Sequence, residues 1–268
     1  MASTSRGHRW NHTAFRGVET CVSTRQVQAL TRAALGDDAV RWPARWWLVL
    51  LACVATSVIV AVRATSDTTP HDPVARATAQ AAEDRLSAIS EVAQRFSAGH
   101  YERTAFGSAW TDAVGVADGR NGCDTRNDIL RRDLADTVVA VVSSCPRAVT
   151  SGEFRSPYTG RFITFRRDRR AGAVQIDHIV PLAFAWDMGA ASWEPTRRVD
   201  FANDPANLVA VDAASNQDKS DKEPGRWMPP DERFHCRYAI QFVTVSSTYG
   251  LSLDRSSVRE LTRALRRC

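Results

Sequence analysis

Two adjacent residues, Asp177 and His178, have the side chains in this sequence that are best suited to chemistry. An imidazole has an unperturbed pKa of about 6.5, so His178 is suited to act as a general base near neutral pH. The oxygen atoms of Asp177 and of the more distant Asn216 are hard ligands of the kind that Mg²⁺ or Mn²⁺ prefers. These residue types are suited to a general base and to oxygen ligands of a divalent metal ion, although an Asp-His pair alone is more often part of a polar surface or a helix cap.

The pair follows Val174–Ile176, which we predict to be a short β-strand. Adjacent side chains on a regular strand point to opposite faces, so Asp177 and His178 can serve one site only if the strand ends or bends there. The nearby Pro181 is compatible with such an ending. We expect three further elements to complete the arrangement: a helix or helical turn over 181–191, a strand over 208–211 and a helix that begins within 213–222.

The order of these residues resembles the HNH (ββα-metal) endonuclease superfamily, and the longer run resembles its secreted members related to the GmrSD C-terminal domain. The resemblance covers roughly residues 101–268 and implies an α+β fold, in which a ββα-metal (HNH/His-Me finger) core carries added helices and disulfides. It rests on Gly122–Asn127, Tyr158–Gly160, Ile176–Leu182, Ala185-Trp186, Gly189-Ala190, Trp193, Phe201–Asp204, Asn207–Val211, Asn216 with Lys219, Trp227 with Pro229, and Cys236 with Tyr238.

The resemblance implies a metal-dependent endonuclease that hydrolyses phosphodiester bonds of nucleic acid with low sequence specificity. In this role His178 activates a water molecule, and Asn207 holds the strand pair and orients that base. Asp177 and Asn216 hold the metal, with Mg²⁺ expected and Mn²⁺ as the alternative. The third letter of the HNH motif is thus Asn rather than His, which leaves the metal preference open.

Two basic residues are candidates for contact with substrate phosphate. Lys219 lies one helical turn beyond Asn216 and would share its helix face, although it could equally be a solvated surface lysine. Arg126 is the other candidate, with a salt bridge inside its own helix as the alternative. The basic run over 161–170 could attract a polyanion or be a solvated loop. Three tryptophans are expected to pack in the core rather than stack on bases: Trp186, Trp193 and Trp227.

The net charge of +5 does not by itself indicate a nucleic-acid partner. Residues 1–63 carry eight arginines against three acidic residues, whereas the 27 basic and 27 acidic residues of 64–268 cancel. Only local basic patches could attract a polyanion. The resemblance nevertheless implies a nucleic-acid substrate, DNA in preference to RNA, and no protein partner is inferred.

An uncharged run over 46–62 predicts a membrane segment or a signal peptide. Its length matches the lower limit of about 17 residues for a bilayer-spanning helix, and Val62-Arg63-Ala64 offers a cleavage site. Seven arginines precede the run, so residues beyond it are expected outside the cytoplasm, either secreted or anchored. The expected organisation is a basic preface (1–45), a signal peptide or transmembrane anchor (46–63), a linker and helix (64–100) and the nuclease domain (101–268).

Four cysteines fall in the part expected to be exported, and none forms a C-x-x-C pair that would suggest a structural zinc site. An even number in an extracytoplasmic chain indicates two disulfides, for which three pairings exist. We favour Cys123–Cys145 and Cys236–Cys268, because each joins neighbouring segments. Four buried free thiols are the alternative.

The remaining elements are predicted from periodicity and turn residues. Helices are expected over 74–98, 124–135 and 256–267, and a strand over 138–142. We expect turns over 152–160, a loop over 193–204, and either a strand or a helix over 238–245.

Two other functions compete with the nuclease. The runner-up is a disulfide-stabilised cell-surface binding module that keeps the nuclease fold but has no activity. The intact set of Asp177, His178 and Asn216 argues against it. The third is a delivered antibacterial nuclease toxin, for which the sequence contains no delivery domain.

Overall fold

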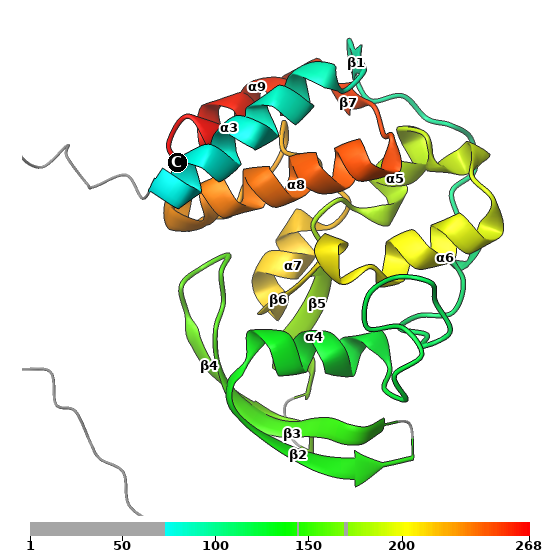
Figure 1. The fold of residues 1–268 in the computed structure, drawn as a ribbon, viewed down its shortest axis with the longest axis vertical. Helices are drawn as coiled ribbons and strands as arrows, with labels where there is room; N and C mark the ends of the chain where they lie inside the picture. Colours follow the sequence, from blue (N-terminus) through cyan, green and yellow to red (C-terminus); the bar gives the residue numbers. More distant parts are fainter. Residues whose placement is uncertain (1–72, 144, 169–170) are drawn as a thin grey trace, which may run out of the picture. The chain divides into compact units, whose positions relative to one another are not determined.

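The computed structural model describes residues 73–143, 145–168 and 171–268, which form a mixed α+β fold (Figure 1). The α-helices are α3 (Pro73–Ala88), α4 (Thr125–Asp133), α5 (Leu182–Asp187), α6 (Pro195–Asn203), α7 (Ala213–Lys219), α8 (His235–Tyr249) and α9 (Arg255–Leu265). The strands are β1 (Glu91–Val92), β2 (Ala135–Val142), β3 (Cys145–Arg155), β4 (Phe162–Arg166), β5 (Val174–His178), β6 (Leu208–Asp212) and β7 (Leu253–Asp254).

The strand that carries Asp177 and His178 is β5, which pairs antiparallel with β6. In this register Asp177 lies opposite Val209 and His178 lies opposite Leu208. Helix α7 follows β6 directly, and the carboxylate of Asp212 caps it by accepting a hydrogen bond from the backbone N–H of Ser215 at 3.0 Å. Strand, strand and helix therefore follow one another around the Asp-His pair, as predicted.

The β5–β6 pair lies between two hydrophobic cores. The first core contains α8 and the helices that pack on it, α3 and α9, which are drawn in orange, cyan and red in Figure 1. The second core lies between α4 and the sheet of β2, β3 and β4. Val209 and Val211 belong to the first core, whereas Ile176 and Ala210 belong to the second. Because side chains alternate along a strand, Asp177 faces the first core and His178 faces the second.

Two disulfides join the segments predicted from the sequence. Cys123–Cys145 links the residue just before the cap of α4 to the start of β3, and Cys236–Cys268 links the start of α8 to the end of the chain. Both favoured pairings are confirmed, and the alternative of four free thiols is wrong. Each disulfide contributes roughly 2–4 kcal/mol by restricting the unfolded chain.

The helix predicted over 74–98 is too long, because α3 ends at Ala88. The chain beyond it is held by tertiary contacts instead. Strand β1 pairs in parallel with β7, and the N–H of Leu253 donates to Ser90 O at 3.0 Å. Arg95 forms ion pairs with carboxylates far along the sequence, of which Asp187 lies at 2.7 Å. Packing has overridden the local helical pattern.

Three other predictions need correction. The expected loop over 193–204 contains helix α6, which begins with Pro195 in its first turn, where the missing N–H of proline costs nothing. The turns expected over 152–160 begin only after β3 ends at Arg155. The basic run over 161–170 is not a loop throughout, since β4 occupies Phe162–Arg166. The segment over 238–245, left open between strand and helix, is part of α8.

The predicted preface and apolar run, 1–45 and 46–62, lie outside the described residues. Among the residues that the structure does describe, no helix has both the length and the apolar character needed to cross a bilayer.

Candidate functional site

The carboxylate of Asp177 is buried and held by two donors from distant parts of the chain. The hydroxyl of Tyr158 donates to Oδ2 at 2.5 Å, and the ammonium of Lys219 lies 2.9 Å from Oδ2 and 3.1 Å from Oδ1. The same ammonium donates to the backbone oxygen of His178 at 2.8 Å. Lys219 therefore ties α7 to the last two residues of β5.

Tyr158 is a site residue to which the sequence assigned no role, although its segment belongs to the resemblance. Its ring is fully buried against Trp227, with ring centroids 5.0 Å apart. Burial, and then the negative charge of Asp177, raise the pKa of Tyr158 well above its ordinary value of about 10. The hydroxyl thus keeps its proton and remains a donor to the carboxylate.

His178 is the last residue of β5, and its ring points away from the Asp177 carboxylate toward α6 and Trp110. Nε2 lies 2.8 Å from the backbone oxygen of Ala202, a group that can only accept, so Nε2 carries the proton and Nδ1 has the free lone pair. The indole of Trp110 stacks on the imidazole, with centroids 5.7 Å apart and planes inclined by 11°.

The imidazole of His178 is neutral near pH 7. Burial is the main cause that lowers its pKa from 6.5 to about 3, and the positive charges of Arg103 and Lys219 act in the same direction. The hydrogen bond to Ala202 opposes this shift only in part. A neutral ring with a free Nδ1 is the protonation state that a general base needs before it reacts.

Asn207 fixes the course of the chain just beyond His178. Its Oδ1 accepts from the N–H of Val180 at 2.9 Å, its Nδ2 lies 3.3 Å from the oxygen of Val180, and its backbone oxygen accepts from the N–H of Ile179 at 2.8 Å. The residue is fully buried and immediately precedes β6. It therefore holds the end of β5 to the start of β6.

Asn216 projects from α7 toward β5, where its Nδ2 donates to the side-chain oxygen of Gln175 at 2.7 Å. Its Oδ1 receives no hydrogen bond from any described residue. A cavity of about 320 Å³ is lined by Asp177, His178 and Asn216 together, with Arg103 and Asp221 also on its wall. The structure thus brings the predicted base and both predicted metal ligands to one cavity.

The donor set around this cavity is small. The described residues contain no group of three or more His, Cys, Asp or Glu side chains arranged to hold a metal ion. A metal here would depend on the carboxylate of Asp177 and on the free amide oxygen of Asn216, with water and phosphate completing its shell. These are oxygen donors of the type that suits Mg²⁺, so the residues present fit such an ion.

The two predicted phosphate contacts are placed differently from expectation. Lys219 is fully buried, so the alternative of a solvated surface lysine is wrong, and its contact with phosphate stays a prediction. The guanidinium of Arg126 donates to the backbone oxygens of Ala171 and Val174, both at 3.0 Å, rather than to a carboxylate within its helix. Arg126 therefore supports the residues that lead into β5.

The three tryptophans singled out in the sequence pack in the first core, as predicted. Trp227 is buried, and Trp186 and Trp193 are partly buried against that core. A fourth tryptophan, Trp110, was not predicted to contribute to the site, yet its ring contacts that of His178. It lies on a loop about 70 residues away in sequence, and no local pattern marks it.

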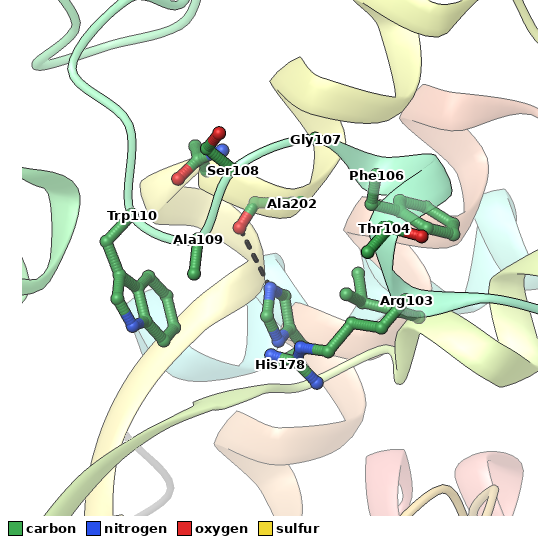
Figure 2. A pocket seen from close by; sticks show the side chains of 11 residues that line it. Arg103, Thr104, Phe106, Gly107, Ser108, Ala109, Trp110, His178 and Ala202 are labelled. Atoms are coloured by element: carbon green, nitrogen blue, oxygen red, sulfur yellow. Dashed lines mark hydrogen bonds between the residues drawn. The ribbon is translucent and has the colours of Figure 1, made fainter.

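A second and larger cavity, of about 500 Å³, also adjoins His178 (Figure 2). The segment Arg103–Trp110 forms much of its wall, and Figure 2 shows the side chain of Arg103 reaching toward the imidazole. Arg103, His178 and Leu182 line both cavities. No pattern in the sequence pointed to Arg103 as part of the site.

Comparison with known proteins identifies the family. Residues 124–264 match the family described as GmrSD restriction endonucleases, C-terminal domain. A protein of Arthroderma benhamiae described as an uncharacterized secreted protein is 37% identical over 220 residues, which cover 81% of this chain and 98% of the relative. No solved structure matches the chain. The resemblance stated from the sequence is confirmed: this chain belongs to the family of the GmrSD restriction endonuclease C-terminal domain.

Proposed function

We propose that the chain is an exported, metal-dependent endonuclease that hydrolyses phosphodiester bonds of nucleic acid with low sequence specificity. The observation that carries this proposal is the cavity lined jointly by Asp177, His178 and Asn216, which come from β5 and α7. Membership of an endonuclease family supports the reaction class. The domain responsible is residues 101–268.

In this proposal His178 is the general base. Its neutral Nδ1 takes a proton from the water molecule that attacks phosphorus, while the Nε2–H bond to Ala202 keeps the ring in the required tautomer and orientation. Asn207 contributes by fixing the backbone of Ile179 and Val180, directly after the base. Asn207 is thus a positioning residue, and His178 is the catalytic one.

Asp177 and Asn216 would hold the divalent metal, Mg²⁺ in the first place and Mn²⁺ as the alternative. A bound cation of this kind stabilises negative charge on the phosphate and on the leaving oxygen. Tyr158 and Lys219 keep the Asp177 carboxylate in one orientation, with a hydrogen bond and an ion pair. Arg103 is exposed on the wall of the cavity and could contact phosphate directly, whereas Lys219 and Arg126 would have to leave their contacts with Asp177 and with the backbone oxygens of Ala171 and Val174.

Export is proposed on three grounds. The uncharged run over 46–62 would serve as a signal peptide or membrane anchor. Two disulfides are typical of extracytoplasmic proteins. The relative from Arthroderma benhamiae is described as secreted.

The test is plasmid nicking by the full chain with Mg²⁺ or Mn²⁺, with and without EDTA. We expect nicking that EDTA abolishes and that His178→Ala lowers at least a hundredfold, the lower end of general-base contributions. His235→Ala is the matched control, because its Nε2 also contacts a backbone oxygen, that of Pro229 at 2.7 Å, but the residue lies outside the cavity. Activity unchanged in His178→Ala would overturn the mechanism.

The runner-up, a binding module with the same fold and no activity, predicts a different outcome. A folded, disulfide-bonded protein that nicks neither DNA nor RNA with either metal would favour it. The retention of the complete set of Asp177, His178 and Asn216 in one cavity is the observation against it.

A further inference from the structure

The 500 Å³ cavity beside His178 has the features of a binding pocket in its own right. Its volume falls within the range of about 300–1,000 Å³ typical of small-molecule sites. Its wall includes Phe106, Ala109, Trp110 and Leu182, so much of it is apolar or aromatic. Neither Asp177 nor Asn216 lines it, and the proposed metal chemistry makes no use of it.

Arg103 stands where this pocket meets the cavity of the proposed reaction. Its side chain is exposed and lines both cavities. It forms no hydrogen bond or ion pair through its guanidinium with any residue in the described ranges. In Figure 2 its side chain extends in the direction of the His178 imidazole, whose pKa its charge lowers. An apolar pocket is thus joined to the reacting cavity by a cation that has no protein partner there.

We infer that this pocket receives an unstacked nucleobase of a single-stranded nucleic acid, with Arg103 on the phosphate that connects this base to the nucleotide being cut. This inference rests on the proposed function and specifies its substrate. A nucleotide combines a planar base with apolar faces and an attached anion, and the pocket combines apolar walls with an adjacent cation. A base in a duplex is stacked and paired, so it must be extruded before it can enter such a pocket.

The inference predicts preference for single strands. Bases of single strands stack on aromatic side chains without a need for a particular sequence, and the contribution per base corresponds to about a 5- to 150-fold change in affinity. Trp110 lies on the wall of this pocket, and its indole also contacts the imidazole of His178, the proposed general base. Stacking of a base in this pocket would then account both for the low sequence specificity and for the preference for single strands.

The direct test measures binding without cleavage. A short fluorescent single-stranded oligodeoxynucleotide and its duplex are titrated with the full chain in EDTA, and anisotropy is recorded. Ala109→Trp fills the pocket and is expected to weaken single-strand binding about 5- to 150-fold while leaving duplex binding unchanged. Ala81→Trp, at an exposed position of α3, is the matched control and is expected to bind as the unaltered chain does.

A second variant tests the cation separately. Arg103→Gln is expected to weaken binding of the single strand and of an abasic strand alike, and to reduce the slope of log affinity against log salt by about 1. Ala109→Trp, in contrast, is expected to leave the abasic strand unaffected. Circular dichroism and thermal melting verify that each variant is folded.

Single-strand binding unchanged in Ala109→Trp, or duplex bound as tightly as single strand, would sink the inference. Because the metal is absent, these results do not depend on catalysis. A protein that binds single strands through the pocket but nicks nothing with Mg²⁺ or Mn²⁺ would support the pocket and overturn only the nuclease.

Discussion

The ammonium of Lys219 lies 2.9 Å from Oδ2 of Asp177, and both side chains are buried. Asp177 lies on β5 and Lys219 is the last residue of α7, which packs against β5. A buried ion pair adds little to stability compared with an apolar pair, but the loss of one partner leaves an uncompensated charge in the interior. The position of Asp177, the predicted metal ligand, therefore depends on Lys219 at the end of α7.

Replacing Lys219 by Met is expected to destabilise the fold by about 3–5 kcal/mol, because Asp177 is then buried without its cation. The urea midpoint of unfolding measures this change. Nicking activity should fall with it, since the Asp177 carboxylate loses one of the two donors that orient it.

The double variant Asp177→Asn with Lys219→Met is the control for this prediction. It removes both charges, so it should be more stable than Lys219→Met alone, and the cycle of single and double variants isolates the coupling between them. Equal urea midpoints for Lys219→Met and the unaltered chain would show that the buried pair does not exist in solution.

Tyr158→Phe is expected to cost about 1.5–3 kcal/mol, the usual contribution of a hydrogen bond to a charged group. The ring itself stays in place against Trp227, so the fold should persist. Tyr238→Phe is the matched control. The hydroxyl of Tyr238 is buried and has no hydrogen-bond partner among the described residues, so its removal should be neutral or stabilising. The urea midpoints of the two variants must differ for the assignment to hold.

The buried neutral His178 makes stability depend on pH. Its pKa is about 3 in the folded chain, against about 6.5 when unfolded, so the unfolded chain binds the extra proton between these values. Stability from this group is complete above about pH 6.5 and is lost as the pH falls toward 3, with a loss of about 2 kcal/mol at pH 5. Urea unfolding at pH 7 and pH 5 measures it.

His178→Gln removes this titration and should flatten the stability profile between pH 7 and pH 5. The comparison is made between pH 7 and pH 5 because carboxylates with ordinary pKa values of about 4 remain largely ionised there. A variant whose stability falls as steeply as that of the unaltered chain would place the pH dependence in another group.

Gly107→Ala is expected to distort the wall of the pocket beside His178. Gly107 has φ of +80° and ψ of −165°, a conformation essentially confined to glycine, which costs other residues about 1–3 kcal/mol. An added Cβ would also lie 2.6 Å from Cγ2 of Val199. Adding Val199→Ala should relieve the collision but not the backbone strain, so thermal melting should show partial recovery. Full recovery would contradict the backbone argument.

The sequence predicted those features of the site that depend on local order. Asp177 and His178 follow a strand, Asn216 lies on the helix after the next strand, and each cysteine pairs with its neighbour in the chain. Such features depend on short-range patterns and on the resemblance, and the structure places them as expected.

The sequence did not predict the features that depend on burial and on distant contacts. Helical spacing places Lys219 near Asn216 but cannot say whether other elements cover it. Arg103, at the start of a short 3-10 helix, and Trp110, on the loop after it, come to the site from a segment with no repeating pattern, and the Ala202 contact uses only a backbone oxygen. Chemistry that relies on backbone atoms leaves no signature in side-chain type.

The placement of β5 between two cores has a consequence for how such a site can change. Asp177 contacts Tyr158 and Lys219, whereas His178 contacts Ala202, which belongs to the first core, and Trp110, which packs against the second. Substitutions at Trp110 can therefore change the proton affinity of the imidazole while Tyr158 and Lys219 still hold the Asp177 carboxylate. A substitution at Lys219 affects both side chains, because its charge also lowers the pKa of His178. One property of the proposed reaction can thus be altered with the other kept, depending on which contact is changed, although the two residues are adjacent in the chain.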